Sequence, residues 1–283
     1  SETLHPEQVV SLLNNYLGVM TDVIIKYEGT IDEFIGDAIL VVFGAPIWKS
    51  NHAERAVACA LEMQNAMEEV NRRNFELGFP EVEMGIGINT GEVVVGNIGS
   101  EKRAKYGVVG REVNMASRIE TYTVGGQILI SESVYNKIES MATINQEMVV
   151  EPKGAKKPIT IYDVVEMKDP WLVSIKKTQD DAVPLKKELA ILYIVLDGKS
   201  VDQDSSEGSI VSLSKKYSKA RIDPMTPVLS NILLQLTHAD PALSNEHIYA
   251  KVIQADPDND GCVTLRFTSV PSPICDYFKS LEC

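Results

Sequence analysis

The segment from Ile31 to Pro46 constrains the fold of this chain more strongly than any other stretch. It places two carboxylates, Glu33 and Asp37, four residues apart beside Gly36, and an apolar run follows immediately. Two short strand-like runs around a Gly-Asp pair predict a β-hairpin. Strands that pack on a core seldom carry acids this close together unless the acids hold a cation or accept hydrogen bonds from a ligand. We therefore predict a functional site at this hairpin.

Length and charge limit the kinds of protein that this chain can be. Its 283 residues favour two ordinary domains over one large domain. The formal net charge of −13 argues against nucleic acid or an anionic membrane as a general partner, so a polyanionic substrate needs local cations and a metal ion. We see no signal peptide and no apolar run that approaches the ~18 residues needed to cross a membrane. The scattered cysteines predict reduced thiols and a cytoplasmic location.

Hydrophobic periodicity predicts a first domain of mixed helices and strands over residues 1–167. Helices that alternate with strands returning as hairpins indicate an α+β sandwich, not a parallel doubly wound sheet. The predicted elements are a helix from Pro6 that ends at Gly29, a hairpin over 30–43, a helix from His52 to about Leu77, strands at 82–88 and 92–98 joined by a turn at 89–91, a strand at 106–109, a helix at 112–122, a strand at 127–130, a helix at 132–138 and a strand at 159–165.

A second, β-rich domain is predicted over 188–283, after a linker at 168–187. Charged residues dominate the linker, which also contains Pro170 and Pro184. Beyond it, short apolar runs alternate with turn-rich loops, as in small barrel-like domains. The predicted strands are 189–196, 208–213, 232–236, 249–255 and 262–267.

A second motif, Val-Asn-Met-Ala-Ser-Arg at 113–118, carries two polar side chains on one face of the predicted short helix. Asn114 and Arg118 are spaced i, i+4, so they project from the same side. An arginine there can neutralise charge that develops on phosphate oxygens, and the asparagine can bond a sugar oxygen. Such a pair alone is most often a solvated helix face. Its combination with the acidic hairpin and the Gly-Ile-Gly-Ile-Asn-Thr-Gly-Glu segment at 85–92 is far more specific.

Together these segments resemble the catalytic domain of class III nucleotidyl cyclases, which include adenylate and guanylate cyclases. The resemblance rests on Phe-Ile-Gly-Asp-Ala-Ile-Leu from Phe34, the run from Gly85 to Ser100, the Val-Asn-Met-Ala-Ser-Arg motif and Lys153-Gly154, and it covers nearly all of residues 1–166. It implies a ferredoxin-like α/β sandwich. It also implies an enzyme that makes a 3′,5′-cyclic nucleotide and pyrophosphate from a nucleoside triphosphate, with active sites shared across a homodimer.

The resemblance implies a role for each motif residue. It makes Asp37 one of two metal-binding aspartates, Asn114 the residue that orients the ribose and Arg118 the transition-state arginine. Lys153 contacts the terminal phosphates in this reading, and Arg103, or the lysine before it, is a further phosphate contact. Two Mg²⁺ or Mn²⁺ ions per active site are implied, and carboxylates are their natural ligands. In the family, Asp37 serves the site whose other residues belong to the second subunit.

The chain departs from the family pattern at its start. The second metal-binding aspartate of the family lies in a strand just before the helix that begins here at Pro6, and the chain begins at Ser1. We expect that the sequence is truncated, not that the natural protein is inactive. The alternative is a catalytically inactive cyclase-fold module that binds a nucleotide or a partner, and an aspartate in the upstream strand would argue against it.

The base-selecting positions differ from those of an adenylate cyclase. Adenine offers an acceptor at N1 and a donor at N6, which suit a lysine with an Asp or Thr partner, whereas the matching residues here are Glu33 and Gly107. Guanine presents adjacent donors at N1 and N2, which one carboxylate can accept together. We therefore favour GTP as the substrate. ATP or a pyrimidine triphosphate are alternatives, and so is an exposed Glu33 with a different residue selecting the base.

The C-terminal domain faintly resembles a PilZ-type β-barrel, through the run Gly208–Ser214 and two later strands. The paired arginines and the Asp/Asn-x-Ser-x-x-Gly signature that bind a dinucleotide in such domains are missing from this sequence. We expect a barrel that lacks ligand binding or an appendage that stabilises the dimer.

Overall fold

The computed structural model describes residues 4–152, 157–176, 180, 182–196, 205–223, 225–238, 240–256 and 262–281. The chain forms two compact units, 1–176 and 177–283. Each unit has a hydrophobic core of its own.

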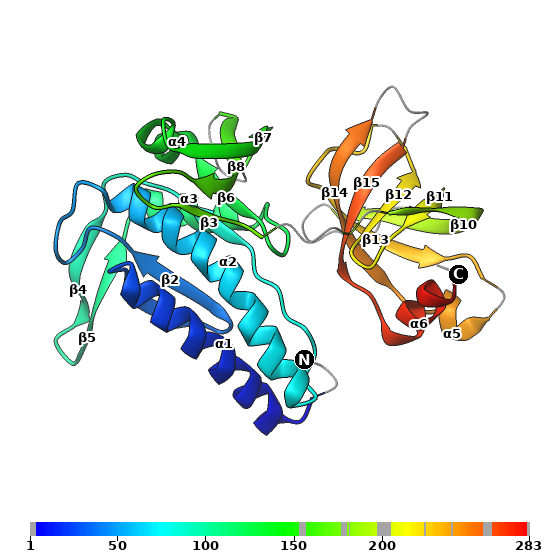
Figure 1. Cartoon of the computed structure of the whole chain (residues 1–283), viewed down its shortest axis with the longest axis horizontal. Coiled ribbons are helices and arrows are strands. Elements are labelled where there is room, and N and C mark those ends of the chain that lie inside the picture. The colour runs from blue at the N-terminus through cyan, green and yellow to red at the C-terminus, as the bar shows by residue number, and fades with distance from the viewer. Residues whose placement is uncertain are drawn as a thin grey trace. The chain divides into compact units, whose positions relative to one another are not determined.

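Two long helices form one layer of the first unit. The helices α1 (Pro6–Lys26) and α2 (His52–Glu76) lie side by side (Figure 1). Both confirm the helices predicted from periodicity, and the proline stands at the first helical turn, where its missing N–H costs nothing. Their facing sides meet in a core that includes Met20, Ile24 and Met63.

The first helix is apolar as well as long. By length and composition alone, α1 is long and apolar enough to cross a membrane. The expectation that no apolar segment approaches the length of a membrane span is therefore wrong. Only 17% of its apolar window is buried within the structure. That buried part, which includes Met20, Val23 and Ile24, packs against α2 and the neighbouring hairpin. The helix is therefore a packed element of the first unit.

The predicted acidic hairpin is present as β1 (Thr30–Ile35) and β2 (Ala38–Val42), which pair antiparallel. Apolar side chains from both strands pack on the core between α1 and α2. Gly29 permits this close approach, because a Cβ there would lie 2.8 Å from the ring of Phe43. Gly36 has a φ of +65°, the left-handed value that a two-residue hairpin turn requires at its first position. The helix layer and the two glycines thus fix the hairpin.

The second layer is a five-stranded sheet in the order β3-β6-β8-β7, with β9 paired to β8. The strands β3 and β6 are parallel, and the other pairs are antiparallel. Side chains from α2 and α4 meet the sheet in one apolar cluster, which confirms the α+β architecture. The bounds are β3 (Ile86–Ile88), β6 (Ile128–Ser131), α4 (Glu132–Ile138), β7 (Ala142–Val150), β8 (Ile159–Met167) and β9 (Val173–Ser174).

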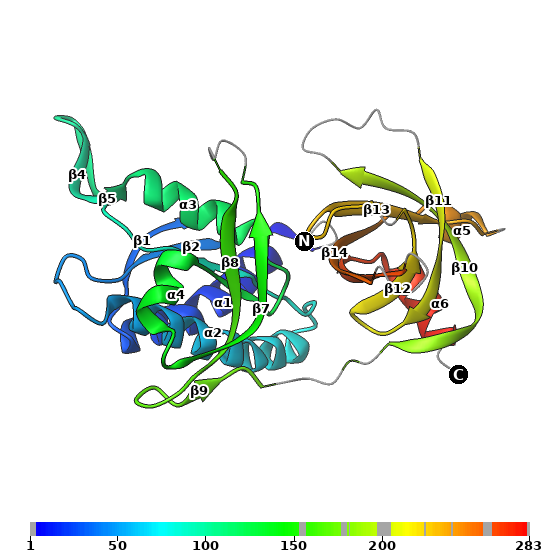
Figure 2. The same ribbon diagram turned by 90° about the horizontal axis from the view of Figure 1, so that it is seen from above.

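The strands predicted at 82–88 and 92–98 do not form one continuous turn-connected pair. The first is shortened to β3 and pairs with β6. The second is β4 (Val94–Ser100), which pairs with β5 (Arg103–Val109) in a hairpin that projects from the unit in both views (Figure 2). The physical reason is that Asn89, a typical turn residue, uses its side chain to hold the helix that follows β5.

The segment after β8 folds back onto α2. The side chain of Asn65 donates to the backbone oxygen of Ser174 over 2.9 Å and accepts from the backbone N–H of Lys176 over 3.1 Å. These contacts keep the first part of the predicted linker, 168–187, within the first unit. The strand β10 then begins at Val183, so the structure differs from the predicted linker at both ends.

The second unit is a closed barrel of six antiparallel strands in the order β10-β11-β12-β15-β14-β13. This confirms the barrel-like architecture, although β12 was not among the predicted strands. Ile274 and Phe278 of the last helix pack into the barrel core. The bounds are β10 (Val183–Leu196), β11 (Ser206–Leu213), β12 (Tyr217–Arg221), β13 (Asn231–Leu236), α5 (Pro241–Ser244), β14 (Ile248–Asp256), β15 (Cys262–Ser269) and α6 (Ser272–Leu281).

Candidate active site

Asp37 occupies the tip of the β1–β2 hairpin, directly after the glycine of the turn. Its side chain is exposed, and no hydrogen bond or ion pair from the described residues engages it. Its negative charge affects Tyr16 on α1. Burial raises the pKa of Tyr16 to about 12, and the charge of Asp37 adds to that rise. The hairpin therefore presents one solvated carboxylate beside the helix layer.

The helix α3 (Arg111–Glu120) carries the second predicted motif. Met115 and Ile119 are buried, whereas Asn114 is exposed and Arg118 is half-buried. One helical turn separates the two polar residues, so their side chains lie on the same side of α3. The pair is thus arranged to contact one ligand. Among the described residues, no hydrogen bond or ion pair joins this pair to the acidic hairpin.

The glycine-rich segment lets α3 lie directly against β3. A Cβ on Gly87 would lie 2.4 Å from the backbone nitrogen of Glu120 and 2.7 Å from the backbone oxygen of Ala116. The Asn89 side chain donates to the backbone oxygen of Glu112 over 3.0 Å and to its carboxylate over 2.9 Å. The segment therefore positions the helix that carries the Asn/Arg pair.

Replacing Gly87 by alanine should disrupt the packing of α3 against β3. Because the added methyl group meets helix backbone and not a flexible side chain, we expect the free energy of unfolding to fall by about 1–3 kcal/mol. Urea unfolding measures this change. Gly18→Ala is the matched control, since Gly18 is an exposed residue of α1 with no atom within 4 Å of an added Cβ. Equal stability of the two variants would contradict the packing of α3 on β3.

The structure brings the two predicted base-selecting positions to one place. Glu33 lies on β1 with its side chain 51% exposed. Gly107 lies buried on β5, and a Cβ there would come within 3.3 Å of Oδ1 of Asp32. Lys105, two residues earlier on β5, places its Nζ 3.2 Å from Oε1 of Glu33. Asp32 and Lys105 are charged neighbours that the sequence analysis did not identify.

A β-bulge explains why Asp32 joins Glu33. The register of the hairpin shifts between Ile31 and Glu33, so Asp32 is an extra residue on β1. Adjacent side chains of a regular strand point to opposite faces. Here both carboxylates reach the same ammonium group, with Oδ2 of Asp32 at 3.7 Å from Nζ of Lys105. The bulge therefore gathers two acids and one lysine beside Gly107.

The predicted phosphate contacts are less defined. Arg103 opens β5 at the exposed tip of the projecting hairpin, next to an exposed Lys102. Lys153 lies outside the described residues. Both phosphate assignments stay predictions.

Asp37 suits a hard divalent cation, because carboxylate oxygens are preferred by Mg²⁺ and Mn²⁺. Across the part of the chain that the structure describes, no group of three or more His, Cys, Asp or Glu side chains gathers to hold a metal ion. Mg²⁺ is commonly bound through one or two carboxylates together with substrate phosphates and water. The exposed Asp37 is therefore suited to hold a metal ion of this kind.

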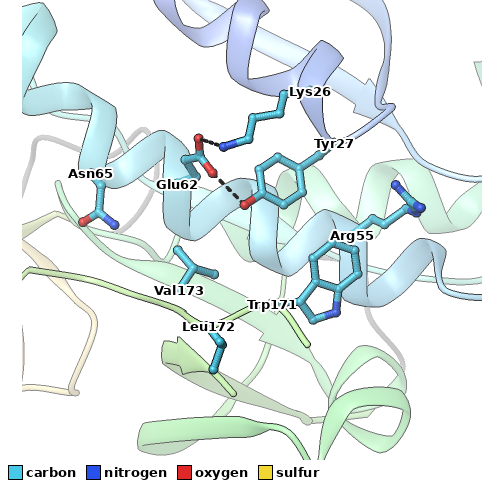
Figure 3. Close-up of a pocket in the computed structure, with 8 residues that line it drawn as sticks. All are labelled: Lys26, Tyr27, Arg55, Glu62, Asn65, Trp171, Leu172 and Val173. Carbon is cyan, nitrogen blue, oxygen red and sulfur yellow. Dashed lines mark hydrogen bonds and ion pairs between the residues drawn. The ribbon is translucent and has the colours of Figure 1, made fainter. Parts of the chain in front are cut away.

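A pocket of about 530 Å³ opens elsewhere in the first unit, between α1, α2 and the segment after β8 (Figure 3). Its polar groups largely bind one another. Glu62 accepts from Nζ of Lys26 over 2.5 Å and from the hydroxyl of Tyr27 over 2.6 Å. The guanidinium of Arg55 lies 5.7 Å from the ring centroid of Trp171. The pocket contains none of the predicted site residues, so we assign it a structural role.

Two curated cyclases are similar in sequence to the first unit of this chain. Adenylate cyclase 1 of Rhizobium meliloti (strain 1021) is 34% identical over 167 residues, which are 58% of this chain and 25% of that protein. Adenylate cyclase of Anabaena cylindrica is 35% identical over 173 residues, 58% of this chain and 34% of that protein. The chain therefore spans only about a quarter to a third of these curated relatives.

Solved structures show the same fold. The guanylyl cyclase Cya2 has 55% sequence identity and a TM-score of 0.61, with 62% of this chain and 89% of that chain covered. The guanylate cyclase domain of RhGC from Catenaria anguillulae, solved in complex with GTP, has 29% identity and a TM-score of 0.53, with 59% and 89% covered. Residues 1–166 match the model of the adenylate and guanylate cyclase catalytic domain, and the chain therefore belongs to that family.

Proposed function

We propose that this protein is a guanylate cyclase, which converts GTP to 3′,5′-cyclic GMP and pyrophosphate. The observation that carries the guanine assignment is the exposed Glu33 carboxylate beside Gly107. A carboxylate accepts the adjacent N1 and N2 donors of guanine, and a glycine offers no side chain to the N6 group of adenine. The 55% identity to the guanylyl cyclase Cya2 supports the same choice.

In the proposed reaction, the ribose 3′-oxygen forms a bond to the α-phosphorus, and the bond from that phosphorus to the bridging oxygen of pyrophosphate breaks. The 3′-hydroxyl gives up its proton to solvent. Bound divalent cations would lower the pKa of this hydroxyl and neutralise the triphosphate. Asp37 would hold them, Asn114 would orient the ribose, and Arg118 would stabilise charge on the phosphate oxygens. The protein supplies mainly positioning and electrostatic stabilisation.

We also propose that the site is completed by a second copy of the chain. Exposed apolar side chains accompany the two site hairpins, and such groups mark interaction surfaces when they gather. The residues are Phe34, Ile35, Val94, Ile98, Tyr106 and Val109. A guanylyl cyclase domain of Blastocladiella emersonii, 29% identical with a TM-score of 0.53, is described as a non-canonical dimer. Asp37 and Glu33 would then serve opposite active sites of a homodimer.

An adenylate cyclase is the second candidate. The ion pair of Lys105 with Glu33 places a donor beside an acceptor, and adenine offers the complementary N1 acceptor and N6 donor. Adenine would leave one oxygen of Glu33 without a donor, whereas guanine fills both. The curated relatives from Rhizobium meliloti and Anabaena cylindrica are named as adenylate cyclases.

Incubating the full-length protein with the four ribonucleoside triphosphates and Mn²⁺, followed by mass analysis, tests the proposed function. We expect cyclic GMP as the main product. Cyclic AMP as the main product would overturn the guanine assignment, but the protein would still be a nucleotidyl cyclase. If no triphosphate yields a cyclic product, the chain is a binding module with a cyclase fold.

A further inference from the structure

The half of the β1–β2 hairpin that carries Asp37 projects from the core. The first three residues of β1 are half-buried, and the last three, next to the turn, are exposed. Among the described residues, the two strands form a sheet of their own and pair only with each other. A strand of six residues spans about 20 Å, so a tilt of about 3° at the open end of the hairpin displaces its tip by about 1 Å. The contacts at the open end therefore set the position of Asp37.

Glu28 links the parts of the chain that meet at this open end. It lies between α1 and β1 with a φ of +61°, a backbone conformation that is uncommon for residues other than glycine. Its half-exposed carboxylate forms ion pairs with Lys49, in the loop after β2, and with Arg55 on α2, whose Nη1 lies 2.7 Å from Oε2. The chain that enters the hairpin is thereby linked to the chain that leaves it and to α2.

Arg55 is held more firmly than an ordinary surface arginine. Its side chain is 23% exposed, and its Nε donates to Oδ1 of Asn51 over 3.0 Å. Its guanidinium lies over the ring of Trp171, with 5.7 Å between the guanidinium carbon and the ring centroid (Figure 3). The planar group makes these contacts and the ion pair with Glu28 at once, which fixes its orientation. A surface ion pair adds little stability, but one built on an immobilised arginine fixes a position.

Trp171 belongs to the segment after β8, which folds back onto α2. Its indole N–H donates to the carboxylate of Glu54 on α2 over 3.3 Å, and its ring centroid lies 5.9 Å from that of Tyr27, at the end of α1. The strand β9 of the same segment pairs with β8. A continuous series of contacts therefore runs from the five-stranded sheet through Trp171 and Arg55 to Glu28.

We propose that Arg55 is a positioning residue for the reaction, because it fixes through Glu28 the hairpin whose tip carries Asp37. Trp171 holds Arg55 in that position. This inference rests on the proposed cyclase function, and it does not depend on which base is cyclised. It gives the contacts between α1, α2 and the segment after β8 a part in ordering a site that they do not touch.

The first test measures metal binding without turnover in the full-length protein. 3′-Deoxy-GTP lacks the hydroxyl group that attacks, so its complex with Mn²⁺ and the protein is unreactive, and electron paramagnetic resonance reports the bound Mn²⁺. Arg55→Met removes the charge and the donors but keeps an unbranched side chain. We expect it to raise the Mn²⁺ concentration at half-saturation by about tenfold. With GTP, it should lower kcat by about tenfold to a hundredfold, the cost of misplacing a reacting group by about 1 Å.

Three further variants separate positioning from folding. Glu28→Gln removes the same ion pair from the side of the hairpin, at a half-exposed residue. A double variant with Arg55→Met should lose no more than Arg55→Met alone, because both changes remove one contact. Arg55→Lys keeps a charge opposite Glu28 and should retain most of the Mn²⁺ affinity. The matched control is Arg72→Met, since Arg72 is another arginine of α2 that pairs with Glu69 and Glu76 of the same helix, and it should change neither quantity.

The role of Trp171 is tested by two substitutions. Trp171→Leu removes the aromatic face from Arg55 and should raise the Mn²⁺ concentration at half-saturation by about twofold to fivefold, the usual effect of a partly exposed cation–π contact. Trp171→Phe keeps a ring and should stay closer to the wild type. Equal effects of the two substitutions would overturn the role of Trp171.

The outcomes distinguish this inference from the proposed function. If Arg55→Met and Glu28→Gln lower the melting temperature but leave kcat and the Mn²⁺ half-saturation unchanged, the positioning role is overturned and the cyclase stands. Fully additive losses in the double variant overturn it as well. A wild type that cyclises ATP and not GTP overturns the guanine assignment alone, because the same comparison with ATP and 3′-deoxy-ATP still decides the role of Arg55. A wild type that cyclises no triphosphate overturns both proposals.

Discussion

Replacing Asp37 by alanine should abolish the formation of cyclic nucleotide in Mg²⁺ and in Mn²⁺ alike. The carboxylate is exposed at the hairpin tip and engaged by no described residue, so it is available to a metal ion. Metal ions contribute several kcal/mol of charge stabilisation to the transition state, and each factor of ten in rate corresponds to about 1.4 kcal/mol, so we expect a loss of at least about a thousandfold in kcat. Product formation by the full-length protein over a range of metal concentrations measures this.

The matched control is Asp22→Ala, which removes another exposed aspartate from the same unit, on α1. It should retain full activity. Because Asp37 contributes no hydrogen bond to the described fold, the melting temperature of Asp37→Ala should stay close to that of the wild type. Activity retained by Asp37→Ala in either metal would contradict its assignment as a metal ligand.

Elements with a strong period were predictable from the sequence. The helices α1 and α2 begin where the apolar repeat and Pro6 or His52 place them. The β1–β2 hairpin follows from the Gly-Asp turn between two apolar runs, because a two-residue turn with glycine fixes the register. These features are local, so a single sequence contains the information.

Long-range contacts were not predictable in the same way. Asn89 has the composition of a turn former, but its side chain holds Glu112, 23 residues away. The strand β7 was missed because its hydrophobicity does not follow its alternating burial: the polar Gln146 is half-buried, and the apolar Val149 is exposed. Pairing partners depend on tertiary packing, which periodicity does not report.

The proposed base site contains residues that the sequence predicts and residues that it does not. Glu33 and Gly107 were identified because they align with motif positions, and the structure places them close together. Asp32 was overlooked because a regular strand would point it away from Glu33, and no residue type announces a bulge in a sequence. Lys105 was overlooked because it precedes the motif on β5. The sequence did contain two signals: the adjacent acids Asp32 and Glu33, and a lysine close to Gly107.

The arrangement of sites across two chains has a separate, quantitative test. In the proposed homodimer, Asp37 of one chain and Asn114 of the other form one active site. An equimolar mixture of inactive Asp37→Ala and inactive Asn114→Ala chains then contains mixed dimers with one intact and one doubly altered site. Because a two-fold dimer exchanges chains at random, we expect about a quarter of the wild-type activity. Asn114 is exposed on α3, so its replacement should not disturb the helix.

The control is a mixture of Asn114→Ala with Arg118→Ala. Both residues lie on the same α3, so every site in a mixed dimer receives one altered helix from one chain or the other, and no intact site can form. Activity measured against the mixing ratio should rise to a maximum near equal proportions for the first pair and stay flat for the second. A flat response for both would show that Asp37 and Asn114 act within one chain, because only then does mixing fail to unite two intact halves.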